Sequence, residues 1–87
     1  SGTMAGGQQP QLQQQEEDED QGKGLRKLAK IYGNMKAKEA SAIMENMTDK
    51  EIVDIMIRMR DRDAAAILTA FTDKTRAAKI SRRMQSE

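Results

Sequence analysis

An apolar pattern that recurs every twelve residues constrains this chain more than any other feature. Within each block, apolar residues stand at positions i, i+3, i+4 and i+7, which lie on one face of an α-helix. The four regular blocks are Gly24–Met35, Lys36–Met47, Thr48–Met59 and Arg60–Phe71. A fifth block, from Thr72, slips by one residue and carries Ala77, Ile80 and Met84. The repeat therefore predicts a series of amphipathic helices.

The period of the repeat predicts a break between successive helices. An α-helix turns by about 100° per residue, so twelve residues rotate the stripe by about 120°. One continuous helix would bury no single face, and the chain is expected to break near each block boundary. Residues 48–51 (Thr-Asp-Lys-Glu) have the form of a capping box, and Asp61 and Thr72 stand where further caps are expected. Gly33–Asn34 favours a helix end because both residues tolerate a positive φ.

These signals predict an all-α fold, a compact right-handed array of about five short helices. The expected helices are 24–33, 37–46, 49–58, 61–70 and 73–85. Val53 and Ile57 add to the apolar stripe of the third helix, so this helix is expected to lie centrally. Met44, Met47 and Met56 are expected to fill the core.

Three segments are expected along the chain. Residues 1–4 resemble a cloning remnant, and residues 5–23 form a Gln-rich and then acidic stretch that is expected to be a disordered linker. Residues 24–87 are expected to fold. The formal charge is −4 over residues 1–23 and +5 over residues 24–87. A folded unit this small is marginally stable, and such units gain stability from a partner or a second copy.

The composition argues against catalysis and against ligand chemistry. The chain has no His and no Cys, and it has no Gly-rich phosphate loop. The block-boundary carboxylates Asp49, Asp61 and Asp73 are explained by helix capping. The basic residues are interleaved with acidic ones and have no aromatic residues among them, which is a weak nucleic-acid footprint. We therefore predict no enzyme activity, no cofactor or metal site, and no nucleic-acid binding.

Protein partners are expected at residues that close the blocks and at the basic corners. The candidate partner-binding residues are Tyr32, Met35, Met59, Arg60, Arg62, Phe71 and Met84. Tyr32 and Phe71 are the only aromatic residues, and aromatic side chains dominate binding hot spots when they are exposed. Both stand at stripe positions, so anchoring of the core is the favoured interpretation, and either one would be an interface anchor if it is exposed.

The block pattern over residues 25–84 resembles the C-terminal domain of the flagellar motility chaperone MotE family. It is also similar to the intracellular N-terminal domain of MgtE-type magnesium transporters and, in fold, to the middle domain of FliG. The residues that carry the resemblance are Leu28, Ile31, Tyr32, Met35, Lys36, Ala40, Ile43, Met44, Met59, Asp61, Ala64, Ala65, Ile67, Leu68, Phe71 and Ala77. The Glu-His-Pro-Gln signature of the FliG domain is absent.

The MotE resemblance implies a bacterial, non-enzymatic protein-interaction domain. Its implied partners are flagellar motor (stator) or export components, and its implied place is outside the cytoplasm, anchored in the membrane through a segment that precedes this one. The MgtE resemblance implies instead a cytoplasmic, Mg²⁺-sensing regulatory domain. A self-assembly module, with a homodimer, is the third reading. The sequence leaves the partner, the compartment and the oligomeric state open.

Overall fold

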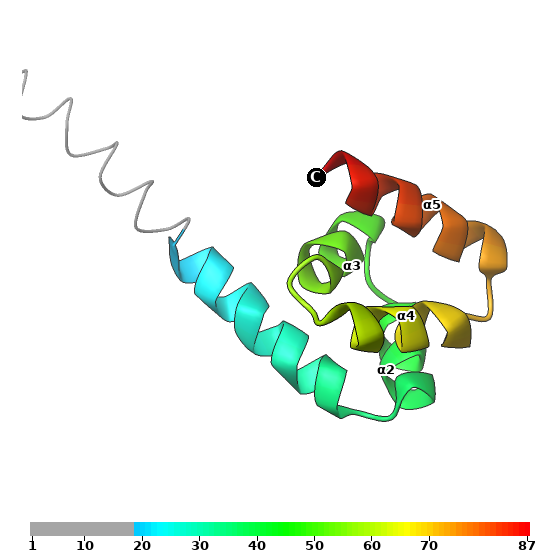
Figure 1. Ribbon diagram of the computed structural model, residues 1–87, viewed down its shortest axis with the longest axis horizontal. Coiled ribbons are helices and arrows are strands. Elements are labelled where there is room, and N and C mark those ends of the chain that lie inside the picture. Colours follow the sequence, from blue (N-terminus) through cyan, green and yellow to red (C-terminus); the bar gives the residue numbers. More distant parts are fainter. Residues whose placement is uncertain (1–18) are drawn as a thin grey trace, which may run out of the picture.

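Five helices make up residues 19–87, the part of the chain that the structure, a computed structural model, describes (Figure 1). The first helix covers residues 19–34. It is followed by α2 (Ala37–Met44), α3 (Asp49–Met56), α4 (Asp61–Ala70) and α5 (Lys74–Ser86), and no strand occurs in the described range. The predicted compact all-α array is confirmed, whereas the right-handed sense of the array stays a prediction.

The predicted breaks are all present, but several helix bounds differ. α2 and α3 each have 8 residues and end two residues before the predicted positions. The first helix includes residues 19–23, which the sequence assigned to the linker. Glu, Gln and Lys in this stretch are good helix formers, so they extend the helix despite Gly22. The cloning remnant and the rest of the linker lie outside the described residues.

The capping box at the start of α3 is confirmed. The Thr48 hydroxyl accepts a hydrogen bond from the Glu51 N–H (3.2 Å), and the Glu51 carboxylate accepts one from the Thr48 N–H (3.0 Å). The predicted end at Gly33–Asn34 is also at the right place. Its expected mechanism is wrong, because no residue in the described range has a positive φ.

The two other predicted caps are wrong by one residue, in opposite directions. Asp61 is the first residue inside α4, and the N-cap is Arg60, whose side chain makes no capping hydrogen bond. At α5 the cap is Asp73, not Thr72. The Asp73 carboxylate accepts a hydrogen bond from the backbone N–H of Arg76 (3.0 Å). Both corners turn without a left-handed residue, through extended N-cap conformations.

The helices pack against partners that are two places apart in sequence, α2 against α4 and α3 against α5. α3 buries four apolar residues, as its predicted central place requires, but Ile57, which was expected to add to its stripe, is 40% exposed. Met44 and Met56 are core residues, as expected, and Met47 is partly buried against them. The core residues are Ala29, Ala40, Met44, Ile52, Val53, Ile55, Met56, Met59, Ala64, Ile67, Phe71 and Ile80.

The first helix buries only part of the face that the repeat predicts, the part at Tyr32 and Met35, which pack against the core. Leu28 and Ile31 are 37% and 46% exposed, whereas Ala29 between them is 3% exposed. The helix is therefore rotated so that the small residue Ala29 also meets the core, and two large apolar residues face outward. Figure 1 shows that the beginning of this helix extends beyond the other four helices.

Gly24 offers a simple test of the first helix. It lies within the helix, and a Cβ atom added there meets nothing within 4 Å. Since glycine is less favourable than alanine in a helix, Gly24→Ala is expected to stabilise the helix by about 0.5–1 kcal/mol. Amide hydrogen exchange at low protein concentration should show slower exchange in residues 19–34. Unchanged exchange rates would contradict the helical assignment of this segment.

Candidate protein-interaction surface

A small pocket lies where the first helix meets the corner between α3 and α4. We call it the corner pocket; its volume is about 260 Å³. It is lined by Ala29, Lys30, Asn34, Arg58, Met59, Arg60 and Asp63. Ala29 and Met59 are buried and apolar, whereas Lys30, Arg58 and Arg60 are exposed. The corner pocket therefore combines an apolar floor with a basic rim.

One side of the corner pocket is formed where the first helix packs closely against α4. A Cβ atom added at Gly33 would lie 2.9 Å from Oδ2 of Asp63, so glycine allows the first helix to approach α4 closely. The same Oδ2 lies 3.7 Å from Nε of Arg60. Arg58 is held separately, since its Nη1 donates to the backbone oxygen of Asp54 (2.6 Å). Arg60 and Arg58 of the rim thus have defined neighbours on α4 and α3.

A second hollow lies near the beginning of the first helix. It is a shallow groove of about 550 Å³, lined by Gln21, Gly24, Leu25, Leu28, Lys50 and Asp54. On its α3 side, Nζ of Lys50 lies 2.9 Å from Oδ2 of Asp54, and this carboxylate raises the pKa of Lys50. Leu25 is half-buried and Leu28 is exposed, so the groove has an apolar side and a charged side.

The candidate partner-binding residues do not form one surface. Phe71 is 1% exposed and Met59 is 9% exposed, so Phe71 anchors the core, and Met59 lines the corner pocket. Tyr32, Met35 and Met84 are partly buried against the core. Arg60 and Arg62 are exposed. Met59 and Arg60 of this set share the corner pocket, and the role of the accessible residues in binding stays a prediction.

The sequence interpretation missed Lys30 and Arg58, the other basic residues of the corner pocket. It also missed Leu28 and Ile31 as surface residues. A signal was present for these two: Gly22, Ala29 and Gly33 lie on one side of the first helix, and small residues mark a face that packs closely. The opposite, larger side chains then remain outside.

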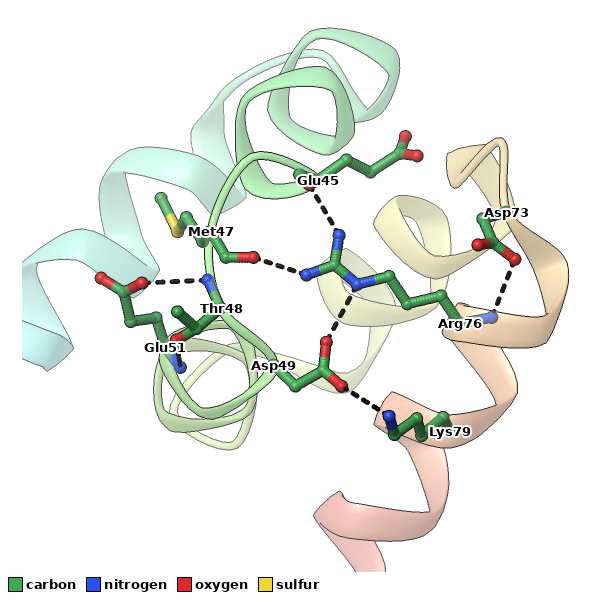
Figure 2. A network of polar contacts seen from close by, with 8 residues as sticks. All are labelled: Glu45, Met47, Thr48, Asp49, Glu51, Asp73, Arg76 and Lys79. Atoms are coloured by element: carbon green, nitrogen blue, oxygen red, sulfur yellow. Dashed lines mark hydrogen bonds and ion pairs between the residues drawn. The ribbon is translucent and has the colours of Figure 1, made fainter.

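A network of polar contacts, which we call the clasp, joins α5 to the corner between α2 and α3 (Figure 2). It consists of Arg76 and Lys79 on α5, the Asp49 carboxylate, and the backbone oxygens of Glu45 and Met47. The Nε of Arg76 donates to Oδ1 of Asp49 (2.9 Å), and Nη1 donates to the backbone oxygen of Glu45 (2.6 Å). Its Nη2 donates to the backbone oxygen of Met47. Lys79 adds a second cation, with Nζ 3.4 Å from the other carboxylate oxygen of Asp49. The guanidinium therefore serves the fold, and it is not available as a general basic patch.

A neighbouring contact fixes the corner between α4 and α5. The Glu45 carboxylate accepts hydrogen bonds from the Thr72 hydroxyl (2.6 Å) and from the Thr72 N–H (3.2 Å). These bonds keep the pKa of Glu45 below its usual value. Thr72, which was expected to cap α5, instead ties this corner to the end of α2.

The clasp predicts a loss of stability in acid. The hydrogen bond from Arg76 lowers the pKa of Asp49, and contacts with Thr72 and Thr48 lower the pKa values of Glu45 and Glu51. A carboxyl whose pKa is lower in the folded state stabilises the fold above its unfolded pKa, about 4, and this contribution disappears as the pH falls.

The urea concentration at the midpoint of unfolding is therefore expected to decrease when the pH is lowered from 7 to 3. Asp49→Asn removes one titrating group, so this variant should be less stable at pH 7 and should lose less on acidification. An equal loss in the variant and the parent chain would show that Asp49 does not contribute to the acid sensitivity.

The described residues show neither a metal centre nor a membrane span. No group of three or more carboxylates in residues 19–87 is arranged to hold a metal ion. Within the same range, none of the helices combines the length and the apolar content that crossing a bilayer requires. Comparisons with protein-family models, with curated proteins and with solved structures found no match to this chain.

Proposed function

We propose that this chain is a non-enzymatic protein-interaction domain of a MotE-like flagellar accessory protein, acting on motor (stator) or assembly components. The corner pocket supports an interaction role, because an apolar floor bordered by basic side chains suits a protein ligand. The flagellar assignment is supported by the resemblance of the twelve-residue blocks.

The chemistry of the corner pocket defines the ligand that it favours. Its volume of about 260 Å³ suits one or two side chains, not a whole cofactor. The lining carries three basic residues and one acidic residue. A partner segment that inserts an apolar side chain between carboxylates would satisfy both parts of the pocket. Electrostatic complementarity of this kind governs specificity and association rate more than raw affinity.

Binding to purified flagellar stator and export components tests the proposal. The immobilised full chain is expected to bind at least one of them, and Lys30→Glu/Arg60→Glu is expected to weaken binding about tenfold or more. Arg82→Glu/Arg83→Glu is the matched control, because it makes the same charge change at exposed positions on α5.

The control variant should bind like the parent chain. Equal losses in both variants would point to net charge instead of the corner pocket. Binding to nucleic acid with no flagellar component bound would overturn the proposed function. Circular dichroism should show first that both variants keep the helical content of the parent.

A further inference from the structure

We propose that the basic face of the first helix extends the corner pocket into one longer site for an extended, acidic segment of a protein partner, an inference that rests on the proposed function. A hollow of about 550 Å³ on this face is lined by Asp20, Lys23, Gly24, Arg26, Lys27 and Lys30. Lys30 also lines the corner pocket, so the two hollows meet at this residue. We call the joined surface the basic groove; its cations are Lys23, Arg26, Lys27, Lys30, Arg58 and Arg60.

The cations of the basic groove outnumber its carboxylates. All six cations are exposed, and the acidic residues of the lining are Asp20 and Asp63. Within residues 19–87, the four cations on the first helix form no ion pair, whereas Arg60 lies near Asp63. The cations of the clasp, in contrast, both lie beside the Asp49 carboxylate. The basic groove therefore has unpaired positive charge to offer an acidic ligand.

The four cations on the first helix also repel one another. Lys23 lies four residues before Lys27, and Arg26 lies four residues before Lys30. Residues at this spacing are neighbours on a helix, and like charges there destabilise it. A row of carboxylates along this face would replace repulsion with attraction. Binding is therefore expected to stabilise the first helix.

The length of the basic groove defines the arrangement of the partner segment. Lys23 and Lys30 are seven residues apart in the helix, which is about 10 Å along its axis. An extended chain advances about 3.3 Å per residue, so about three or four residues cover this distance. A segment with an aliphatic side chain in the corner pocket would thus place the carboxylates of its next few residues beside these lysines. The beginning of the helix extends beyond the other helices, so this end of the basic groove has room for the segment (Figure 1).

The lining favours a peptide over a nucleic acid or a membrane. Ala29 and Met59 form an apolar floor at one end, which suits an aliphatic side chain. None of the described lining residues is aromatic, so unpaired bases would have no ring to stack on. The two floor residues are buried, so they are not placed to insert into a bilayer.

Fluorescence anisotropy with a synthetic peptide tests the basic groove. The probe is a labelled peptide of leucine followed by seven glutamate and aspartate residues, and the full chain is expected to bind it. Replacing the acidic residues of the peptide with glutamine and asparagine should weaken binding about tenfold or more. Replacing its leucine with serine should weaken binding about fivefold or more. Unchanged affinity of the serine peptide would contradict the proposal, because the site would then bind any polyanion.

Variants of the chain test the part of the basic groove outside the corner pocket. Lys23→Glu/Lys27→Glu should weaken peptide binding about tenfold or more, whereas Arg82→Glu/Arg83→Glu, with the same charge change on α5, should bind like the parent. Circular dichroism should show first that both variants keep their helical content. Equal losses in the two variants would show an effect of net charge and would overturn the proposal.

A spin label on the peptide tests its orientation. A nitroxide at the acidic end is expected to broaden the NMR signals of residues 23–27, and one at the leucine end those of residues 58–60. The same broadening pattern from both labels would rule out the proposed arrangement. Tighter binding of a single-stranded oligothymidylate or of phosphatidylserine vesicles than of the peptide would also overturn the proposal. So would salt-sensitive self-association of the chain that Lys23→Glu/Lys27→Glu abolishes.

The purified flagellar components separate this inference from the proposed function. If Lys23→Glu/Lys27→Glu binds a component like the parent chain while Lys30→Glu/Arg60→Glu does not, the basic groove is wrong and the proposed function stands. If the chain binds the acidic peptide as expected but binds no flagellar component, the basic groove is supported and the flagellar assignment is wrong.

Discussion

Replacing Phe71 with alanine is expected to unfold most of this domain. Phe71 is 1% exposed and heads the fully buried side chains by volume, so its removal leaves a cavity that the short helices fill only in part. Substitutions of this kind cost about 3–5 kcal/mol. A small domain has roughly 5 kcal/mol of total stability. Circular dichroism should show a large loss of helix at 25 °C, or a greatly lowered urea midpoint.

Two comparisons separate this core role from a binding role. Phe71→Leu keeps much of the buried volume and should retain the fold with a smaller loss of stability. Ile31→Ala changes an exposed apolar residue and should leave unfolding almost unaltered. If Phe71→Ala kept the stability of the parent chain, the burial of Phe71 would be wrong, and its predicted role in partner binding would regain support.

Replacing Arg76 with alanine is expected to destabilise the fold by about 2 kcal/mol. The change removes three hydrogen bonds from the clasp and leaves two backbone oxygens and the Asp49 carboxylate without this donor. The guanidinium side chain is 24% exposed, so solvent replaces these bonds only in part. Urea unfolding at pH 7 measures the effect, and the acid sensitivity of the variant should be smaller than that of the parent.

Arg76→Lys tests whether geometry or charge dominates in the clasp. A lysine keeps the charge but lacks the planar fork that reaches three acceptors from one position. It is therefore expected to recover only part of the lost stability. Full recovery by lysine would show that charge alone holds α5 to the α2–α3 corner. Arg82→Ala, an exposed residue on the same helix, should have almost no effect.

The central helices were predictable because their sequence pattern and their environment agree. In the block that contains α3, all four stripe residues are buried, and the capping box starts the helix where the sequence indicates. In such a segment the apolar period, the local cap and the tertiary packing favour the same conformation. The end of the first helix was also placed correctly, although it does not use the left-handed residue that was expected.

The buried face of the first helix was less predictable, because the apolar repeat favours one face and the close contact with neighbouring helices favours another. The repeat favours burial of Leu28 and Ile31, but Ala29 is buried in their place, and a Cβ atom at Gly33 would lie only 2.9 Å from the Asp63 carboxylate. A single sequence does not reveal which of these two effects dominates. The outcome depends on the neighbouring α3–α4 corner, whose position follows from contacts far apart along the chain.

The candidate site was the least predictable part for the same reason. The corner pocket joins Lys30 and Arg60, which are thirty residues apart, and the clasp joins Arg76 to Asp49. Neither pair follows a local spacing rule. Arginines and lysines that look equivalent in the sequence therefore have different roles, because only some of them lie near a hydrogen-bond acceptor in the folded chain.

The alternating order of packing, α2 against α4 and α3 against α5, has a consequence for how the domain unfolds. In a simple repeat array each unit contacts only its neighbour, so the array can fray from one end. Here the detachment of α5 removes cover from α3, whose buried residues lie at the centre of the core. α2 through α5 are therefore expected to exchange their protected amides in one concerted opening, with the outer part of the first helix opening on its own.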